Sequence, residues 1–281
     1  MKKSGVISLS IIIFLIALSG VLFGVVFCLR DQKVIILDKS ELEISNEDII
    51  KTAGLKKGQS IFMIDKDKAI SKIEAKYPYL KVVQIKTTSV TEIEICLRAR
   101  HDMFYAKHNN NFYILDEELK VLTIIENNES NEPTQLTRIE ETALNINDLT
   151  KVCDFVGNEK QQKAVKELYV ALITTVAKTE GEGEEAIEVA ITREDVCDIL
   201  KNIQFEVFET YNKMVITTKY GVKLDIENPT QNMQDKINIC FATIEHFLSD
   251  PQTESKAQTG TIKIFYDIEN NQKCVYIPHA D

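Results

Sequence analysis

The sequence predicts an α+β membrane protein. Its expected parts are an N-terminal transmembrane helix, a domain of order β-α-α-β-β, and a mixed α/β domain with a mainly antiparallel sheet. Two observations predict this fold. Residues 6–29 contain no charged side chain, and about 20 consecutive apolar residues in a helix can cross a bilayer. Beyond them, helical patterns are interspersed with runs that alternate between apolar and polar residues, as half-buried strands do.

The apolar run at 6–29 is predicted to be an uncleaved anchor. A secretory signal peptide has a shorter apolar core, of roughly 7–15 residues, followed by a small-residue cleavage site. The end of this run, Phe27-Cys28-Leu29, offers no such site. Because long domains are translocated largely regardless of charge, residues 1–5 are expected to be a short cytoplasmic tail and the long C-terminal part to be extracytoplasmic. The predicted location is the cell membrane, with a single pass.

Charge and cysteine content argue against several classes of protein. Lys and Arg number 33 against 43 Asp and Glu, a net charge of −10, so nucleic acid is a poor partner. The six cysteines form no C-x-x-C motif, which argues against a zinc ribbon or a thioredoxin-like site. Buried free thiols are the simplest interpretation of most of them. The sequence leaves open the redox state of Cys96, Cys153, Cys197, Cys240 and Cys274.

The first extracytoplasmic domain is predicted at residues 34–103. A short strand precedes a helix that begins at Ser45, where Asp48 completes a capping box, and that ends at Gly54. Asp65 or Asp67 begins a second helix, which ends before Pro78. Two strands follow, at 81–88 and 91–100. The second alternates almost ideally, so one face is expected in the core and the other in solvent. The core face is Ile93, Ile95, Leu97 and Ala99, and the solvated face is Glu92, Glu94, Arg98 and Arg100.

Residues 104–281 are predicted to form one β-rich domain. Two amphipathic patterns predict helices, because apolar residues recur every three or four positions, and a capping box of Thr192 with Asp195 predicts a third, shorter helix. The expected helices are 159–178, 193–202 and 231–248. The expected strands are 112–115, 120–125, 187–191, 203–210, 213–219, 221–226, 259–267 and 273–278.

Four stretches in the first domain carry a family resemblance: SNEDIIKTAGLKKG at 45–58, SIFMID at 60–65, PYLKVV at 78–83 and ICLRAR at 95–100. Residues 34–103 resemble a POTRA domain, and the whole chain resembles the FtsQ/DivIB family of bacterial division proteins. The sequence departs from the family pattern in places. Leu119 stands where glycine is usual after Asp116, and Val90 stands where proline is common between the two strands. A divergent member is therefore expected.

No arrangement of residues that would support catalysis can be assembled. The sequence lacks the phosphate-binding loop, the nucleophile elbow and the zinc helix. Its four histidines have no ligand spacing, and the acidic stretch with Glu182, Glu184 and Glu185 lacks the regular spacing of a calcium loop. We therefore predict no catalytic, cofactor-binding or metal-binding residue, and no cofactor.

Interaction is the better-supported function class. A β-domain that ends in strands leaves an edge whose unpaired backbone groups can pair with another chain. The resemblance implies a non-catalytic scaffold at the division septum that binds bitopic coiled-coil partners of the FtsL/DivIC type through its last strands. The implied partner-binding residues are Ile262, Lys263, Ile264, Phe265, Tyr266, Val275 and Tyr276. Either Ile262 and Ile264 or the opposite face of the same strand, with Phe265, must belong to the core.

Two other functions stay open from the sequence. One is an anchored extracytoplasmic enzyme or ligand sensor, which a buried pocket with converging titratable groups would favour. The other is a POTRA-type secretion component. The single POTRA-like unit, with no barrel-like series of alternating strands, argues against it.

Overall fold

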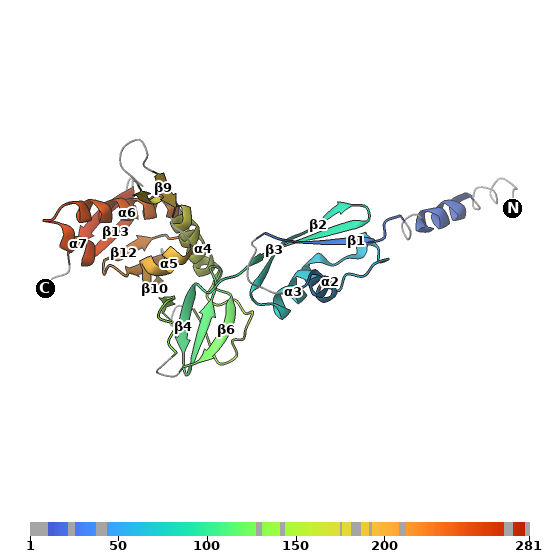
Figure 1. The fold of residues 1–281 in the computed structure, drawn as a ribbon, viewed down its shortest axis with the longest axis horizontal. Coiled ribbons are helices and arrows are strands. Elements are labelled where there is room, and N and C mark those ends of the chain that lie inside the picture. Colours follow the sequence, from blue (N-terminus) through green and yellow to red (C-terminus); the bar gives the residue numbers. More distant parts are fainter. Residues whose placement is uncertain are drawn as a thin grey trace. The chain divides into compact units, whose positions relative to one another are not determined.

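The chain divides into two compact units, Met1–Arg100 and His101–Asp281 (Figure 1). Each unit has its own hydrophobic core. The division lies close to the predicted domain start at residue 104. The structure is a computed structural model, and it describes residues 11–21, 26–37, 44–127, 131–140, 144–174, 176–180, 187–190, 193–207, 212–266 and 272–278.

The first unit contains a three-stranded sheet with two helices, in the predicted order β-α-α-β-β. The strand order in the sheet is β1-β3-β2; β1 runs parallel to β3, and β2 runs antiparallel to it. Its elements are β1 (Asp31–Ile36), α2 (Asn46–Ala53), the 3-10 turn η1 (Ile61–Met63), α3 (Lys66–Lys76), β2 (Leu80–Ser89) and β3 (Glu92–Ala99).

Local signals fix the two helices. The Ser45 hydroxyl accepts a hydrogen bond from the Asp48 N–H at 3.1 Å, which begins α2. Gly54 ends that helix with φ 73°, a left-handed conformation in which a side chain is unfavourable. Of the two candidates for the start of α3, Asp65 is the one used, because its carboxylate accepts from the Lys68 N–H at 2.9 Å. Both caps confirm the predicted helix starts.

The face of β3 that was predicted to be solvated is partly buried. Glu94 is only 6% exposed and Arg100 only 3%. Glu94 forms an ion pair with Lys86, and Arg100 forms one with Glu74 at 3.2 Å. The prediction was wrong for Glu94 because β3 is the central strand, so side chains from both neighbouring strands, such as Lys86 and Lys33, lie beside it. It was wrong for Arg100 because this residue follows the end of β3 and pairs with Glu74 of α3.

The end of the predicted anchor belongs to the first unit. Leu29 is fully buried in the core of this unit, and its N–H donates to the Gln59 carbonyl at 2.8 Å. The Phe27 carbonyl accepts from the Ile61 N–H at 2.9 Å. The predicted boundary at residue 29 was therefore wrong, since an apolar run shows no break where it passes from an anchor into a domain core.

The rest of the predicted anchor is only partly described. Residues 11–21 are helical, and their large apolar side chains are exposed. Residues 1–10 and 22–25, and with them the predicted cytoplasmic tail, lie outside the described residues. Within the described part of the chain, no helix is both long enough and apolar enough to cross a membrane.

The second unit is built on a nine-stranded sheet of order β14-β13-β12-β11-β10-β7-β4-β5-β6. Most neighbouring strands are antiparallel, and the parallel pairs are β12 with β13, β10 with β7, and β7 with β4. The sheet is therefore mixed and mainly antiparallel, as predicted. Its strands are β4 (Phe104–His108), β5 (Asn111–Leu115), β6 (Val121–Glu126), β7 (Thr137–Ile139), β10 (Leu200–Val207), β11 (Asn212–Thr218), β12 (Lys223–Glu227), β13 (Thr261–Tyr266) and β14 (Gln272–Ile277).

Helices cover one face of this sheet (Figure 1). Ile237, Cys240 and Ile244 of one helix lie in the same buried cluster as Ile262 and Ile264 of β13. The helices are α4 (Glu159–Thr174), α5 (Arg193–Ile199), α6 (Met233–Ser249) and α7 (Glu254–Gln258), and a separate hairpin consists of β8 (Val176–Glu180) and β9 (Ile187–Ala190).

Some boundaries in the second unit differ from the prediction. The helix predicted at 159–178 ends at Thr174, and β8 begins at Val176. The strand predicted from 203 begins at Leu200. The strands β4 and β7 and the helix α7 were not predicted. β7 has three residues, too few to show a period, and it is ordered by parallel pairing with β4 and β10.

Leu119 occupies a glycine-like conformation in the turn before β6. Its φ is 60°, in the left-handed region that costs an ordinary residue roughly 1–2 kcal/mol. Its side chain is fully buried, which offsets the strain. The neighbouring Asp116 carboxylate accepts from the N–H groups of Glu118 and Lys120 at 2.8 and 2.9 Å. The turn therefore keeps the shape that glycine usually gives it.

Candidate partner-binding edge

The strand β14 lies at one end of the nine-stranded sheet. Among the described residues it pairs with β13 alone, in antiparallel register from Thr261 opposite Ile277 to Tyr266 opposite Gln272. The backbone groups on its other side therefore have no strand partner in the described part of the chain. Such an edge can add a strand from another protein.

One face of β13 and β14 belongs to the core. Ile262 and Ile264 are fully buried under α6. Tyr276 lies opposite Ile262, and its ring packs edge-on against Phe247 at 5.0 Å. The Tyr276 hydroxyl donates to the Thr259 carbonyl at 3.1 Å. These side chains therefore hold the end of the sheet to the helices.

The opposite face carries the accessible members of the predicted set. Lys263 of β13 lies opposite Val275 of β14, and Phe265 lies opposite Lys273. Val275 is 44% exposed and Ile277 is 47% exposed. Strand alternation places both on the outward face with Lys263 and Phe265. This outward group is called the β14 face below.

Charged residues continue this face across the neighbouring strands. Lys213 of β11 forms ion pairs with Glu206 at 3.1 Å and with Asp225 at 3.0 Å. Lys263 pairs with Glu227 at 3.1 Å. Burial would lower the pKa of Lys213, but its hydrogen bonds to these two carboxylates outweigh that effect and raise the pKa. The sheet thus presents paired charges beside the apolar side chains of its last strand.

Tyr266 is tied to the start of α6. Its hydroxyl oxygen accepts from the Asn232 side-chain N–H at 3.3 Å, and the Lys236 ammonium lies 5.2 Å from its ring centre. Lys236 is fully buried, and its ammonium donates to the carbonyls of Glu227 and Asn228. Burial lowers the pKa of Lys236 to about 8. These contacts therefore hold the end of β13 and the end of β12 to the start of α6.

The structure places two further residues on the β14 face and divides the predicted residues between the two faces of the sheet. Lys273 and Ile277 share the β14 face but were not predicted. The alternation of β14 could have indicated them, since both lie two positions from Val275. Of the predicted residues, Lys263, Phe265 and Val275 lie on the β14 face, whereas the side chains of Ile262, Ile264 and Tyr276 pack inward.

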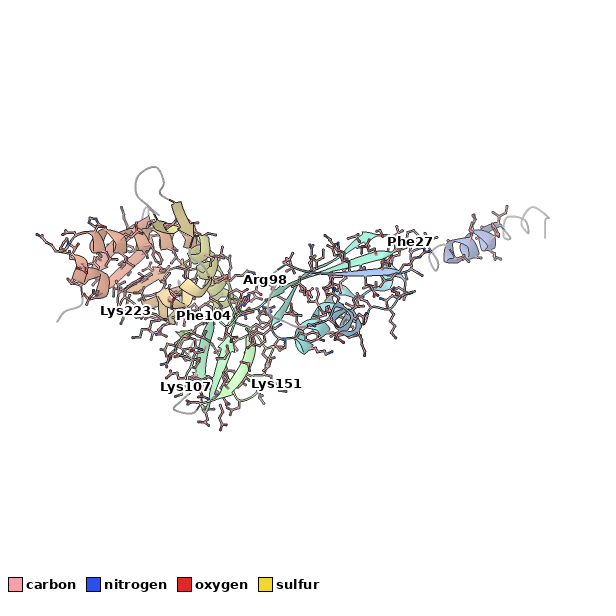
Figure 2. The ribbon with its side chains drawn as sticks, in the orientation of Figure 1. Phe27, Arg98, Phe104, Lys107, Lys151 and Lys223 are labelled. Carbon is pink, nitrogen blue, oxygen red and sulfur yellow. The ribbon has the colours of Figure 1, made fainter. Side chains whose placement is uncertain are left out.

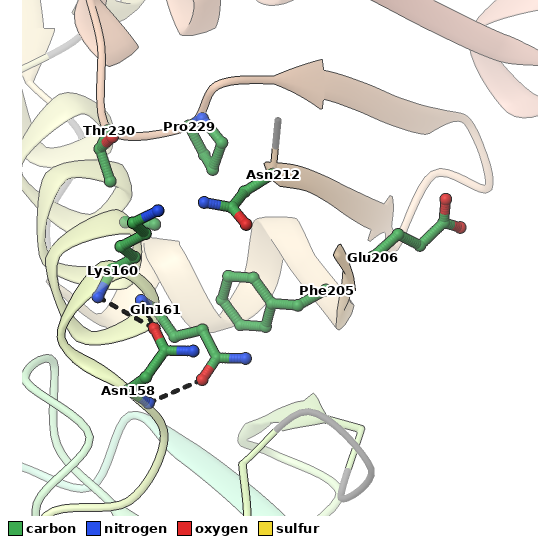
Figure 3. A pocket seen from close by; sticks show the side chains of 9 residues that line it. Asn158, Lys160, Gln161, Phe205, Glu206, Asn212, Pro229 and Thr230 are labelled. Carbon is green, nitrogen blue, oxygen red and sulfur yellow. Dashed lines mark hydrogen bonds between the residues drawn. The ribbon is translucent and has the colours of Figure 1, made fainter. Parts of the chain in front are cut away.

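A shallow pocket lies near the start of α4, beside β10 and β11 (Figure 3). The Asn158 side-chain oxygen accepts from the N–H groups of Lys160 and Gln161 at 3.0 and 3.1 Å. The Gln161 side-chain oxygen accepts in turn from the Asn158 N–H at 2.8 Å. These polar groups form a reciprocal helix cap, which accounts for their position without a ligand.

The described residues contain no group of three or more His, Cys, Asp or Glu that could hold a metal ion. The predicted acidic stretch at 182–185 lies outside the described residues. All six cysteines are free thiols in the structure, and Cys96 and Cys240 are buried as expected while Cys274 is exposed.

Comparison with known proteins identifies the first unit. Residues 33–98 match the family model described as "POTRA domain, FtsQ-type". The first unit is therefore similar to an FtsQ-type POTRA domain over residues 33–98, and its β-α-α-β-β part is called the POTRA domain below. The matched residues coincide with the β-α-α-β-β fold described above, and the predicted resemblance to the FtsQ/DivIB family is confirmed.

A curated relative points the same way. The chain is 32% identical over 84 residues to a protein named "Cell division protein DivIB" from Clostridium acetobutylicum. The match covers 30% of this chain and 33% of that protein. The chain therefore aligns with about a third of the relative's length, and similarity to a division protein rests on that segment and the POTRA domain.

Proposed function

We propose that this protein is a membrane-anchored extracytoplasmic scaffold of the bacterial division machinery, without catalysis of its own. The FtsQ-type POTRA domain carries this proposal, since it is the segment shared with a known division family. Cell division proteins act at the septum, so we expect this chain there.

The anchor in this proposal is the apolar run from residue 6 to Val26. It contains about 20 residues without a charge, which is enough to cross a bilayer as a helix. Residues 11–21 of this run are helical and expose their large apolar side chains, as a lipid-facing helix would. The part of the chain that follows the anchor, from Phe27 on, is then extracytoplasmic.

The partner surface in this proposal is the β14 edge with the β14 face. An incoming strand would gain backbone hydrogen bonds from the edge, while Val275, Ile277 and Phe265 offer apolar contacts and Lys263 a charged one. The expected partners are bitopic coiled-coil division proteins of the FtsL/DivIC type. Because Ile262 and Ile264 are core residues, they support this surface from beneath.

A charged substitution on the β14 face tests the surface without disturbing the core. Val275→Asp places a carboxylate where the partner would bury an apolar side chain. We expect crosslinking in cells to an FtsL/DivIC-type partner to fall about tenfold, since an unpaired buried charge costs well over 1.4 kcal/mol. The matched control is Val83→Asp on β2, because Val83 is 45% exposed and Val275 is 44% exposed.

The outcomes test the β14 face and the scaffold proposal independently of each other. If Val275→Asp and Val83→Asp crosslink as well as the parent chain, the β14 face is not the binding surface. If the parent chain itself crosslinks to no bitopic division protein, the scaffold proposal fails. Equal thermal stability of the two variants must accompany either conclusion.

A further inference from the structure

Several exposed apolar residues of the POTRA domain gather at one of its ends, apart from Leu37 and Val83. Phe62 is 66% exposed and Met63 is 84% exposed on the turn η1. Val90, in the turn between β2 and β3, is 52% exposed. With Phe27 and Val26 these residues are called the apolar tip below.

Hydrogen bonds place the apolar tip around the chain that emerges from the apolar run. Cys28 forms a β-bridge with Ser60, and the Gly58 N–H donates to the Leu29 carbonyl at 2.8 Å. The rings of Phe27 and Phe62 contact each other with centres 5.3 Å apart. The turn η1 therefore lies directly against the first residues after the proposed anchor.

The turn between β2 and β3 lies at the same end. The Arg30 N–H donates to the Thr91 carbonyl at 2.8 Å, and Asp31 of β1 pairs with Glu92 of β3. Val90 is the neighbour of Thr91 in that turn. Phe27, labelled in Figure 2, marks this end of the domain, where the β2–β3 turn also lies (Figure 1).

Basic residues flank the apolar tip. Lys56 and Lys57 precede Gly58 in the turn that bonds to Leu29, and both are exposed. Arg30, also exposed, follows the emerging chain. Protruding apolar side chains with basic neighbours suit a lipid surface, where rings enter the headgroup region and cations meet anionic lipids.

We propose that the apolar tip rests in the outer surface of the bilayer and holds the POTRA domain against it. This inference rests on the proposed anchor, because the anchor brings Val26 and Phe27 to the lipid surface. No polar residue separates the apolar run from Phe27, so the domain has no linker that could lift it from the membrane. The tip would thus fix which end of the POTRA domain faces lipid.

Tryptophan fluorescence tests this arrangement, because the chain contains no Trp. Single variants Phe62→Trp and Val90→Trp report on the tip in the full-length chain, reconstituted at low density in vesicles of phosphatidylcholine and phosphatidylglycerol. The control, Leu37→Trp, replaces an exposed apolar residue, 58% accessible, at the other end of β1. At about 3.3 Å per residue, Leu37 lies roughly 20 Å from the start of that strand. Leu15→Trp reports on the anchor itself.

Lipids with brominated acyl chains should quench Leu15→Trp, Phe62→Trp and Val90→Trp. We expect both tip probes to lose about half of their emission, because interfacial side chains lie roughly 5–10 Å into the headgroup and acyl boundary. Leu37→Trp should lose none. Quenching of Leu15→Trp with unquenched tip probes would overturn this inference and leave the anchor intact.

Two other outcomes would also overturn the inference. If Leu15→Trp is not quenched, the anchor fails and the tip has no membrane to rest in. If the tip probes shift to shorter wavelength without quenching by bromine, a second copy of the chain covers the tip in place of lipid.

Discussion

Replacing Lys236 with methionine should destabilise the second unit. The Lys236 ammonium donates to the carbonyls of Glu227 and Asn228 at 2.7 and 2.8 Å, and so ties the end of β12 to the start of α6. Methionine fills a similar volume but donates no hydrogen bond. Leaving a buried acceptor without a donor costs about 1–3 kcal/mol. Because this turn is only part-buried, we take the low end for each carbonyl and expect a loss of about 2 kcal/mol.

Urea unfolding of the full-length chain in detergent, followed by far-UV circular dichroism, measures this loss. The matched control is Lys223→Met, at the exposed start of β12, which should change the unfolding free energy by less than about 0.5 kcal/mol. A Lys236→Met chain as stable as the control would refute the reasoning, since the two hydrogen bonds would then contribute nothing.

The same lysine predicts a pH dependence. Burial lowers its pKa to about 8 in the folded chain, against roughly 10.4 in an unfolded one. Between these values the unfolded chain binds more protons, so the stability of the parent chain rises with pH. The neutral amine keeps two N–H donors for the two carbonyls. The stability difference between the parent chain and Lys236→Met should therefore grow from pH 8 to 10, and a constant difference would contradict the assigned pKa.

Two further predictions concern backbone and thiols. Gly221→Ala should destabilise the fold by about 2–4 kcal/mol, since φ is 107° and an added Cβ would meet the Gln258 carbonyl oxygen. Gly58→Ala, with φ 86° and open space around it, should cost only about 1 kcal/mol in the same urea titration. Alkylation followed by mass spectrometry should modify exposed Cys274 before Cys240, whose pKa burial raises. Equal rates would show that Cys240 is accessible.

Much of the first unit could be predicted from the sequence because its signals are local. Ser45 and Asp65 begin helices with their own side chains, and Gly54 ends one through its own backbone. The alternation at 91–100 identified the core face of β3. These features depend on residues a few positions apart, so a single sequence displays them.

The candidate site could be predicted only in part. The family resemblance implied a partner surface on the last strands, which stays a prediction, and the sequence could not say which face of β13 is buried. That choice follows from α6, whose Ile237 and Ile244 cover Ile262 and Ile264. Lys273 and Ile277 join the β14 face through pairing with β13, a contact that no local pattern records.

The sequence by itself determined the apolar run, the helix caps and the FtsQ-type POTRA pattern, because each depends on residues that are close together in the sequence. Only the tertiary structure decided that Phe27 and Leu29 belong to the POTRA domain, that Glu94 and Arg100 are buried, and which strand ends the large sheet. These facts depend on contacts between distant segments, such as Leu29 with Gln59 and Arg100 with Glu74. Whether a residue is buried depends on which distant segments fold against it, and a single sequence does not show which segments those are.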